Sequence, residues 1–219
     1  AGIVTMVMAA KIALFKDDLK ALLAFSTVSH LGLITMLLGF GTKAAAMVAM
    51  FHILNHATFK AALFMVAGIV DHEAHTRDIK RLGGLRKLMP VTFTIATLAG
   101  LSMAGIPPLN GFLSKEMMLE QAAHTPPGLI GLLATLGALV SVAYSFRLIA
   151  HTFLGPQRTD YPHKPHDPGF GLWAAPALLA GLVVAIGLMP MTVAGWLVDA
   201  AAGAVTGTAA QAHNAQLHG

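Results

Sequence analysis

Apolar runs of about 20 residues recur along this chain, and they restrict its fold more than any other feature. At about 1.5 Å per helical residue, each run is long enough to cross a hydrocarbon core of roughly 30 Å. Of the 219 residues, 56% are hydrophobic and 11% are charged, whereas about a quarter of the residues in soluble domains are charged. The sequence therefore predicts an all-α, polytopic transmembrane helix bundle.

About six hydrophobic segments meet the length criterion, and a shorter stretch rich in Ala and Gly follows them. The approximate bounds of the six are 1–15, 22–41, 44–70, 89–123, 128–154 and 172–189, and the shorter stretch covers 192–205. We expect residues 1–190 to form the bundle, and residues 191–219 to form a short apolar helix and a disordered polar tail. The first segment begins without a basic flank, so we interpret the chain as a fragment rather than one that starts with a signal peptide.

The basic residues of the connecting loops are divided unequally between the two ends of the predicted bundle. One set of loops carries most of them, namely Lys16, Lys20, Arg77, Lys80, Arg81, Arg86, Lys87, Arg158 and Lys164. The other set offers only Lys43. By the positive-inside rule the crowded loops are cytoplasmic, which predicts a multi-pass protein of the cell (inner) membrane. No basic run is suited to nucleic acid, so no nucleic-acid partner is expected.

The fourth segment contains residues that should break a helix inside the membrane. Pro107 and Pro108 lie between Gly105 and Gly111. Proline removes a backbone donor and clashes with the preceding turn. Freed backbone groups are costly in lipid, so such breaks persist inside protein or beside a water-filled cavity, and they are typical of transporter sites. The alternative is a simple hairpin between two short helices.

The third segment carries an unusual stripe of ionisable residues. His52, His56 and Lys60 are spaced i, i+4, i+8, so successive members are rotated by about 40° and rise by about 6 Å. Ionisable groups in mid-membrane cost several kcal/mol, and histidine exchanges protons near neutral pH. The stripe therefore favours a proton relay. The alternative is that each histidine satisfies a buried hydrogen bond between helices.

Two further residues are candidates for the same path. Lys115 follows the proline pair directly, and it is either a titrating group at the end of a half-channel or an interfacial lysine paired with Glu116. His30 lies beside three hydroxyl residues in the second segment and is a weaker candidate.

A metal site is the competing interpretation of the two histidines in the third segment. His52 and His56 have the spacing of a helical pair of metal ligands, which leaves a membrane metalloenzyme as a third functional class. No carboxylate lies within that helix, and Lys60 one turn further would repel a dication. We interpret the His-bearing stretches 71–75 and 160–167 as solvated connectors, and we expect no metal and no cofactor.

Three stretches of this sequence resemble the antiporter-like subunits of respiratory complex I and of Mrp-type cation/proton antiporters. They are residues 18–32, 51–60 and 111–116, and the likeness extends over about residues 3–189. His30 and the run from Asn55 to Lys60 are similar to the Mrp-type A protein rather than to the L protein of complex I.

The resemblance implies long tilted helices, two of them discontinuous, and a hydrophilic axis that includes His52, His56, Lys60 and Lys115. It implies a component of a hetero-oligomeric Na⁺/H⁺ antiporter, a transporter rather than an enzyme, that works with other membrane subunits, protons, Na⁺ and the lipid bilayer. It also implies that the N-terminal half of the family's pump unit is missing. The alternative is a proton-pumping membrane component, of the L type, of NADH:quinone oxidoreductase.

Overall fold

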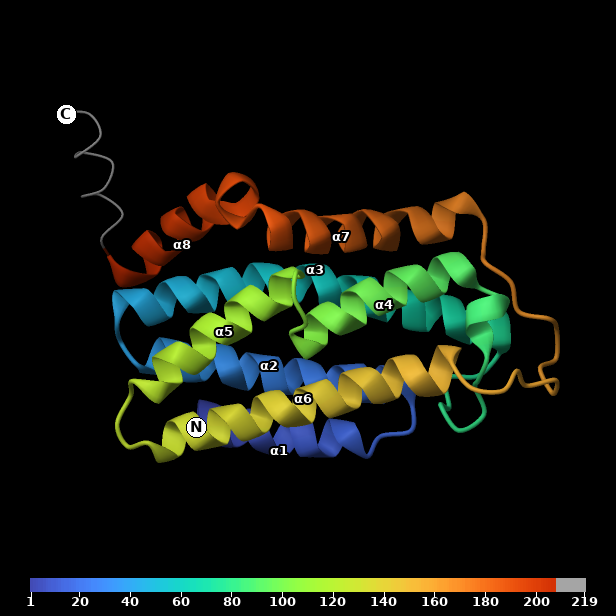
Figure 1. Ribbon diagram of the computed structural model, residues 1–219, viewed down its shortest axis with the longest axis horizontal. Helices are drawn as coiled ribbons and strands as arrows, with labels where there is room; N and C mark the ends of the chain where they lie inside the picture. The colour runs from blue at the N-terminus through green and yellow to red at the C-terminus, as the bar shows by residue number, and fades with distance from the viewer. Residues whose placement is uncertain (208–219) are drawn as a thin grey trace.

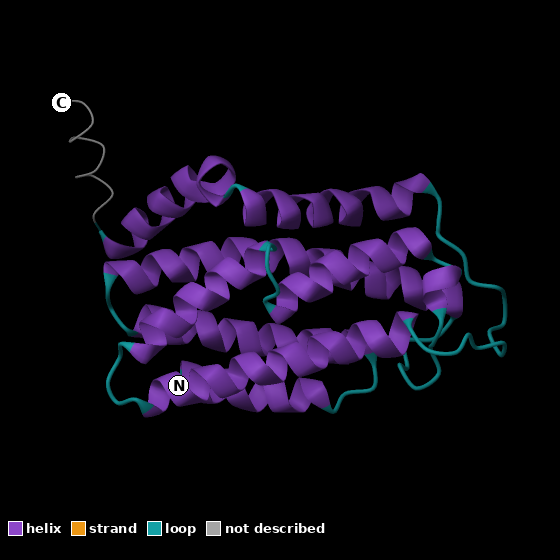
Figure 2. Ribbon diagram, viewed as in Figure 1, coloured by secondary structure: helices purple, strands orange, loops and turns teal. Residues whose placement is uncertain are grey.

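The structure, a computed structural model, describes residues 1–207, and this part of the chain is helical with no β-strand (Figure 2). In chain order the helices are α1 (Gly2–Leu14), α2 (Leu19–Gly39), α3 (Lys43–Ala74), η1 (Leu85–Lys87), α4 (Pro90–Ala104), α5 (Asn110–Ala123), α6 (Leu129–Phe153), α7 (Phe170–Leu188), η2 (Met191–Gly195) and α8 (Trp196–Thr206). The predicted all-α class is confirmed.

The long helices run side by side along one direction (Figure 1). Four of them, α2, α3, α6 and α7, are each long and apolar enough to cross a membrane. Helices α1 and α4 are apolar but shorter, and α4 continues the same crossing as α5. The predicted polytopic bundle is therefore confirmed, with the fourth crossing shared between two half-helices.

The predicted discontinuity lies between α4 and α5. Helix α4 ends at Ala104, and α5 begins at Asn110. Gly105 ends α4 in the left-handed conformation (φ +88°), which favours glycine, and its N–H donates to two carbonyls of the last turn at 3.0 Å. Gly111 lies outside the non-helical stretch, in the first turn of α5.

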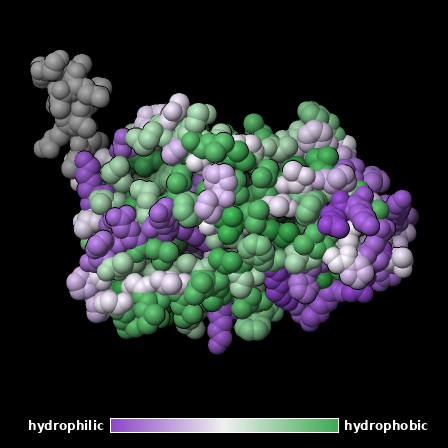
Figure 3. Space-filling view, in the orientation of Figure 1, coloured by the Kyte–Doolittle hydropathy of each residue, from purple (hydrophilic) through white to green (hydrophobic). Residues whose placement is uncertain are grey.

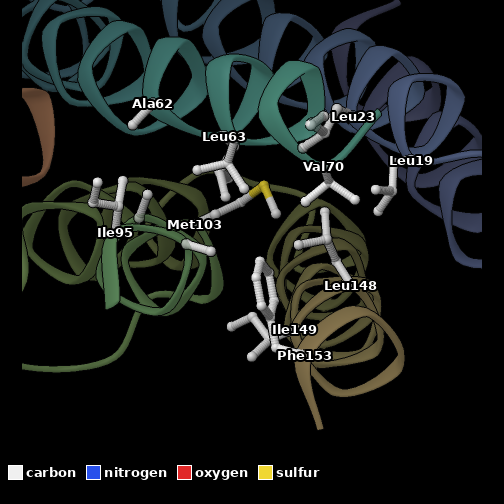
Figure 4. Close-up of a cluster of buried hydrophobic side chains, with 14 of the residues drawn as sticks. Leu19, Leu23, Ala62, Leu63, Val70, Ile95, Met103, Leu148, Ile149 and Phe153 are labelled. Atoms are coloured by element: carbon white, nitrogen blue, oxygen red, sulfur yellow. The ribbon is translucent and has the colours of Figure 1, made fainter. Parts of the chain in front are cut away.

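A large apolar cluster packs α3 against its neighbours (Figure 4). Leu63 and Val70 of α3 lie against Met103 of α4 and against Leu148 and Phe153 of α6, and all five side chains are buried. Between membrane helices such packing supplies van der Waals contact rather than a hydrophobic driving force. This cluster fixes the relative positions of the helices that carry the polar residues described below.

The basic loops gather at one end of the bundle, where the surface is hydrophilic (Figure 3). Asp17, in the loop between α1 and α2, contacts Lys80 and Arg147, each at 2.5 Å. Lys80 belongs to the loop between α3 and α4, and Arg147 to α6. These ion pairs join the loop between α1 and α2 to the loop between α3 and α4 and to α6.

The stretch 71–75, which we expected to be a solvated connector, is mostly helical. Helix α3 continues to Ala74 and ends at His75, which has a left-handed conformation (φ 52°). The extra turn is stabilised from a neighbouring helix, because Asp71 accepts a hydrogen bond from Lys20 of α2 at 3.0 Å. A prediction based on apolar runs places the end of a helix too early when the last turn is polar and its side chains are paired with a neighbouring helix.

The C-terminal part of the described chain continues from α7 through η2 into α8, which runs on in the same general direction and packs against α3. Helix α8 overlaps the short apolar stretch 192–205. The tail expected to be disordered lies mostly at 208–219, outside the described residues.

Candidate functional site

The ionisable residues predicted for a proton path lie inside the bundle. His30, His52, Lys60 and Lys115 are each at most 5% exposed, and His56 is half-buried. They come from α2, α3 and α5, so three segments that are distant in sequence contribute to one buried region. None of the ion pairs formed by residues 1–207 involves either buried lysine.

Two histidines form the centre of this region. His30 Nδ1 lies 3.0 Å from His52 Nε2, and the two rings stack with centroids 5.2 Å apart. The remaining nitrogen of each ring also has a partner: His52 Nδ1 lies 2.8 Å from Ser114 Oγ, and His30 Nε2 lies 3.3 Å from Tyr144 Oη. A neutral imidazole donates from one nitrogen and accepts at the other, so the pair forms a continuous hydrogen-bonded chain from α6 through α2 and α3 to α5.

Lys60 lies beyond the histidine pair. Its Nζ donates to the carbonyl of Leu23 at 3.2 Å and to Ser26 Oγ. Ser26 and His30 are one turn apart on α2, a rise of about 6 Å. The lysine is thus bound to neutral oxygens, and its hydroxyl partner lies one helical turn from His30.

Lys115 occupies the point where α4 ends. Its Nζ donates to the carbonyls of Met103 at 2.6 Å and Ala104 at 3.2 Å, and to Ser141 Oγ of α6. The interfacial pairing with Glu116 that we weighed from the sequence is not formed. The ammonium instead caps the carbonyl end of a half-helix, where the helix dipole is negative.

His56 differs from the other two histidines. Its ring lies 5.1 Å from that of His30 and 6.2 Å from that of His52, and edge-on to Phe59. Its Nε2 is buried and has no hydrogen-bond partner among the described residues. The stripe on α3 therefore faces one region, but only His52 of its two histidines is hydrogen-bonded there.

A second buried network joins the helix break to α3. Asn110 Nδ2 donates to Asn55 Oδ1 and to Thr58 Oγ1, both at 3.1 Å, while Asn55 Nδ2 donates to the backbone carbonyl of Asn110 at 3.0 Å. Ser102 Oγ donates to Asn110 Oδ1 at 2.6 Å and accepts from Gly111 N–H at 2.9 Å. All of these polar groups are paired, so the network fixes both half-helices against the helix that carries His52 and Lys60.

Sequence reasoning did not identify four of these partners as site residues: Ser114, Asn110, Ser141 and Tyr144. The signal was present for α6, where Ser141, Tyr144 and Ser145 lie within about one turn in the middle of a predicted span. A polar cluster at helical spacing inside a predicted span would have indicated a buried face.

Within residues 1–207, no group of three His, Asp or Glu residues could hold a metal ion. The second His-bearing stretch has a local structural role, since Asp167 accepts hydrogen bonds from Val91 N at 2.8 Å and Thr92 N at 2.9 Å at the start of α4.

Comparison with known proteins identifies the family of this chain. Residues 1–141 match the family model described as NADH:quinone oxidoreductase/Mrp antiporter, TM. The chain belongs to this family. The predicted resemblance is confirmed, and family membership together with several apolar helices indicates a multi-pass membrane protein.

Individual relatives are antiporter components. The chain is 49% identical over 195 residues to the A/B protein of a probable K⁺/H⁺ antiporter of Rhizobium meliloti, covering 87% of this chain and 20% of that protein. It is 41% identical over 245 aligned positions to the A1 protein of a Na⁺/H⁺ antiporter of Staphylococcus saprophyticus, covering 100% of this chain and 30% of that protein. The two names differ in the cation.

A solved structure shows the same fold. The chain superposes on a chain of the Mrp complex from Dietzia sp. DQ12-45-1b with a TM-score of 0.80 and 37% identity, covering 95% of this chain and 22% of that one. The chain thus spans between 20% and 30% of the length of these relatives.

Proposed function

We propose that this chain provides part of a proton-translocation path in one component of a hetero-oligomeric Na⁺/H⁺ (cation/proton) antiporter. The observation that carries the proposal is the buried series of hydrogen-bonded side chains from Tyr144 through His30 and His52 to Ser114. Lys60 lies near one side of this series and Lys115 near the other. The names of the relatives support the transport class.

The hydrogen-bond pattern suits stepwise proton transfer. When a proton arrives at one nitrogen of an imidazole, the ring can release a proton from its other nitrogen. His52 has hydrogen-bond partners at both nitrogens, so a proton taken from His30 at Nε2 can leave from Nδ1 toward Ser114. Ser114 directly precedes Lys115 in the sequence. In the proposed path Lys115 is the final titratable group, and its Nζ donates to the carbonyl of Met103 in the last turn of α4.

The remaining step lies between the histidines and Lys60. Ser26 and His30 face the same side of α2, and a water between them would close the gap of about 6 Å. His56, with its unpaired buried Nε2 beside His30, is a second branch on which such a water could bind. The proposed path therefore includes His30, His52, His56, Lys60 and Lys115.

The proposal extends to orientation and partners. The basic loops at one end would face the cytoplasm of the cell (inner) membrane, following the positive-inside rule. Exposed apolar side chains along α1, α6 and α7, such as Met8, Leu132 and Leu178, would contact lipid or other membrane subunits of an Mrp-type complex. The similarity to a chain of the Dietzia Mrp complex supports an assembly of this kind.

One alternative has a specific observation in its favour. The matching family also includes subunits of NADH:quinone oxidoreductase. The same hydrogen-bonded side chains could therefore serve a proton-pumping component of that complex. Dependence on an added alkali cation separates the two, because an antiporter couples proton flux to a cation gradient and a redox pump does not.

The experiment is Lys60→Ala in the full-length protein within its complex, with Na⁺-driven proton flux measured in membrane vesicles. We expect flux at background level, with normal co-purification of the other subunits. Lys43→Ala, at the exposed start of the same helix, is the matched control and should keep wild-type flux. Wild-type flux in Lys60→Ala would contradict the proposed path.

A further inference from the structure

The carbonyl end of α4 is paired in two different ways. The carbonyls of Leu101 and Ser102 accept from the N–H of Gly105 at 3.0 Å, as in an ordinary helix end. The next two carbonyls, of Met103 and Ala104, have the Lys115 ammonium as their partner. If that ammonium left, two carbonyls would be unpaired inside the bundle, which is costly.

The third ligand of the ammonium completes a small oxygen cage, which we define as Met103 O, Ala104 O and Ser141 Oγ. Ser141 donates its own hydroxyl proton to the carbonyl of Ala138 at 2.9 Å and accepts from the lysine at its oxygen. All three ligands are neutral oxygens at the negative end of a half-helix. Carbonyl and hydroxyl oxygens without carboxylates suit a monovalent alkali ion better than Mg²⁺ or Ca²⁺, which bind mainly through carboxylates.

A cavity of about 280 Å³ opens beside this cage, between α5 and α6. Its lining is mostly apolar and includes Gly105, and its polar members are Lys115, Glu116 and Thr135. The exposed carboxylate of Glu116 and the hydroxyl of Thr135 can solvate a cation that approaches the cage. The cavity therefore places open space with one carboxylate and one hydroxyl directly beside the cage.

The lysine side chain is closely packed against Gly105, which also lines the cavity. A Cβ added to Gly105 would lie 2.9 Å from Lys115 Cδ, so the glycine leaves just enough space for the extended side chain. The extended side chain reaches the cage along this glycine, and the open space beside the ammonium is the cavity.

We propose that the oxygen cage is a binding site for a monovalent alkali cation, occupied alternately by the protonated Lys115 ammonium and by the transported ion. When Lys115 releases its proton to water in the cavity, its neutral amine withdraws and a cation from the same cavity takes its place. One positive charge leaves the cage as one enters, so the two carbonyls always have a positive partner. This cation-site proposal rests on the proposed function. It assigns the cation to the oxygen cage of Lys115, the lysine that ends the proposed proton path.

The test measures competition in the full-length protein within its complex, reconstituted in proteoliposomes. Initial proton flux is recorded against Na⁺, K⁺ and Li⁺ concentration at several pH values. We expect lower pH to raise the apparent KM for the cation without lowering the maximal flux. Removing one ligand by Ser141→Ala should raise that KM by roughly three- to tenfold, because one hydrogen-bond-strength contact is lost, and should change the ratio of KM values among the three ions.

The matched control is Ser145→Ala, one turn along the same helix, whose buried hydroxyl donates to the carbonyl of Ser141 at 2.6 Å rather than to the cage. It should leave the KM ratio unchanged. A change in the proton affinity of Lys115 alone would shift all three KM values by the same factor, so the ratio is the readout specific to the cage. Ser141→Cys, which retains side-chain volume but offers sulfur, should behave like Ser141→Ala and serves if the alanine variant does not assemble.

An unchanged KM ratio in both Ser141 variants would overturn the cation site. The proposed function would stand in that case if Lys60→Ala had lost flux. Wild-type flux in Lys60→Ala would instead overturn the proton path, whatever the Ser141 variants show.

Discussion

The Nδ1 atom of His52 lies 2.8 Å from the Oγ atom of Ser114, the residue directly before Lys115. This contact joins the stripe of ionisable residues on α3 to the half-helix that follows the break. The distance between these two atoms depends on how α4 and α5 are held, because only five residues separate the end of α4 from the start of α5. The helix break therefore determines the geometry of the proposed path as well as exposing carbonyls to Lys115.

Gly111→Ala should destabilise the bundle at the break. A Cβ at this position would lie 1.9 Å from the carbonyl oxygen of Ser102, so α5 must move away from α4. Overpacking of this kind costs about 1–3 kcal/mol or more in the free energy of unfolding. Thermal unfolding of the purified complex in detergent measures this loss of stability.

Gly181→Ala is the matched control for this prediction. It lies in α7, where an added Cβ has no atom within 4 Å, and alanine favours the helix by roughly 0.5–1 kcal/mol. Equal stability of the two variants would show that the close approach at Gly111 is not needed.

Asn110→Leu should weaken the same region by a different route. The substitution removes the hydrogen bonds that the Asn110 side chain forms with Asn55 Oδ1, Thr58 Oγ1 and Ser102 Oγ, and a buried polar atom that loses its partner costs about 1–3 kcal/mol. The expected result is a lower unfolding temperature and poor assembly with the other subunits. Gln121→Leu, near the other end of α5, should have little effect, and the same loss in both variants would argue against the network.

Much of the fold was predictable, because the length of an apolar run and the chemistry of proline act locally. The proline pair and its flanking glycines located the break, although Gly111 proved to lie inside α5. The extra turn of α3 was missed because its stability comes from Lys20 on another helix.

The candidate site was predictable in part for the same reason. His52, His56 and Lys60 were found by helical spacing within one segment. The bonds of His52 to His30 and Ser114 could not be found that way, since they depend on how three helices pack. The difference between a bonded His52 and an unbonded His56 is likewise a property of tertiary structure.

Acid should loosen the end of the bundle that carries the basic loops. Hydrogen bonds from Lys80 and then from Arg147 hold the pKa of Asp17 below its ordinary value of 3.8. A lowered pKa in the folded state means that the pairs stabilise the fold fully above about pH 4 and that this stabilisation is lost as the pH falls through the lowered value. The unfolding temperature should therefore fall more steeply with acid in the wild type than in Asp17→Asn.

Asp160→Asn is the control for this pH dependence, since Asp160 is exposed and forms no ion pair in the described part of the chain. It should follow the wild-type curve. An Asp17→Asn variant with an unaltered acid dependence would mean that these pairs contribute nothing measurable, as is common for exposed ion pairs.

The most direct measurement of the central claim is cation-driven proton flux, at several pH values, in His52→Leu and His72→Leu forms of the full-length protein in its complex. His52 is bonded at both nitrogens within the bundle, whereas His72 lies exposed in the last turn of α3. We expect His52→Leu to reduce flux by roughly a hundredfold, the scale of a lost proton-transfer group, and His72→Leu to leave it unchanged. The flux of His56→Leu should fall between those of the other two variants, because the His56 ring lies beside the hydrogen-bonded histidines without a hydrogen bond of its own. Equal flux in the His52 and His72 variants would contradict a proton path through these histidines.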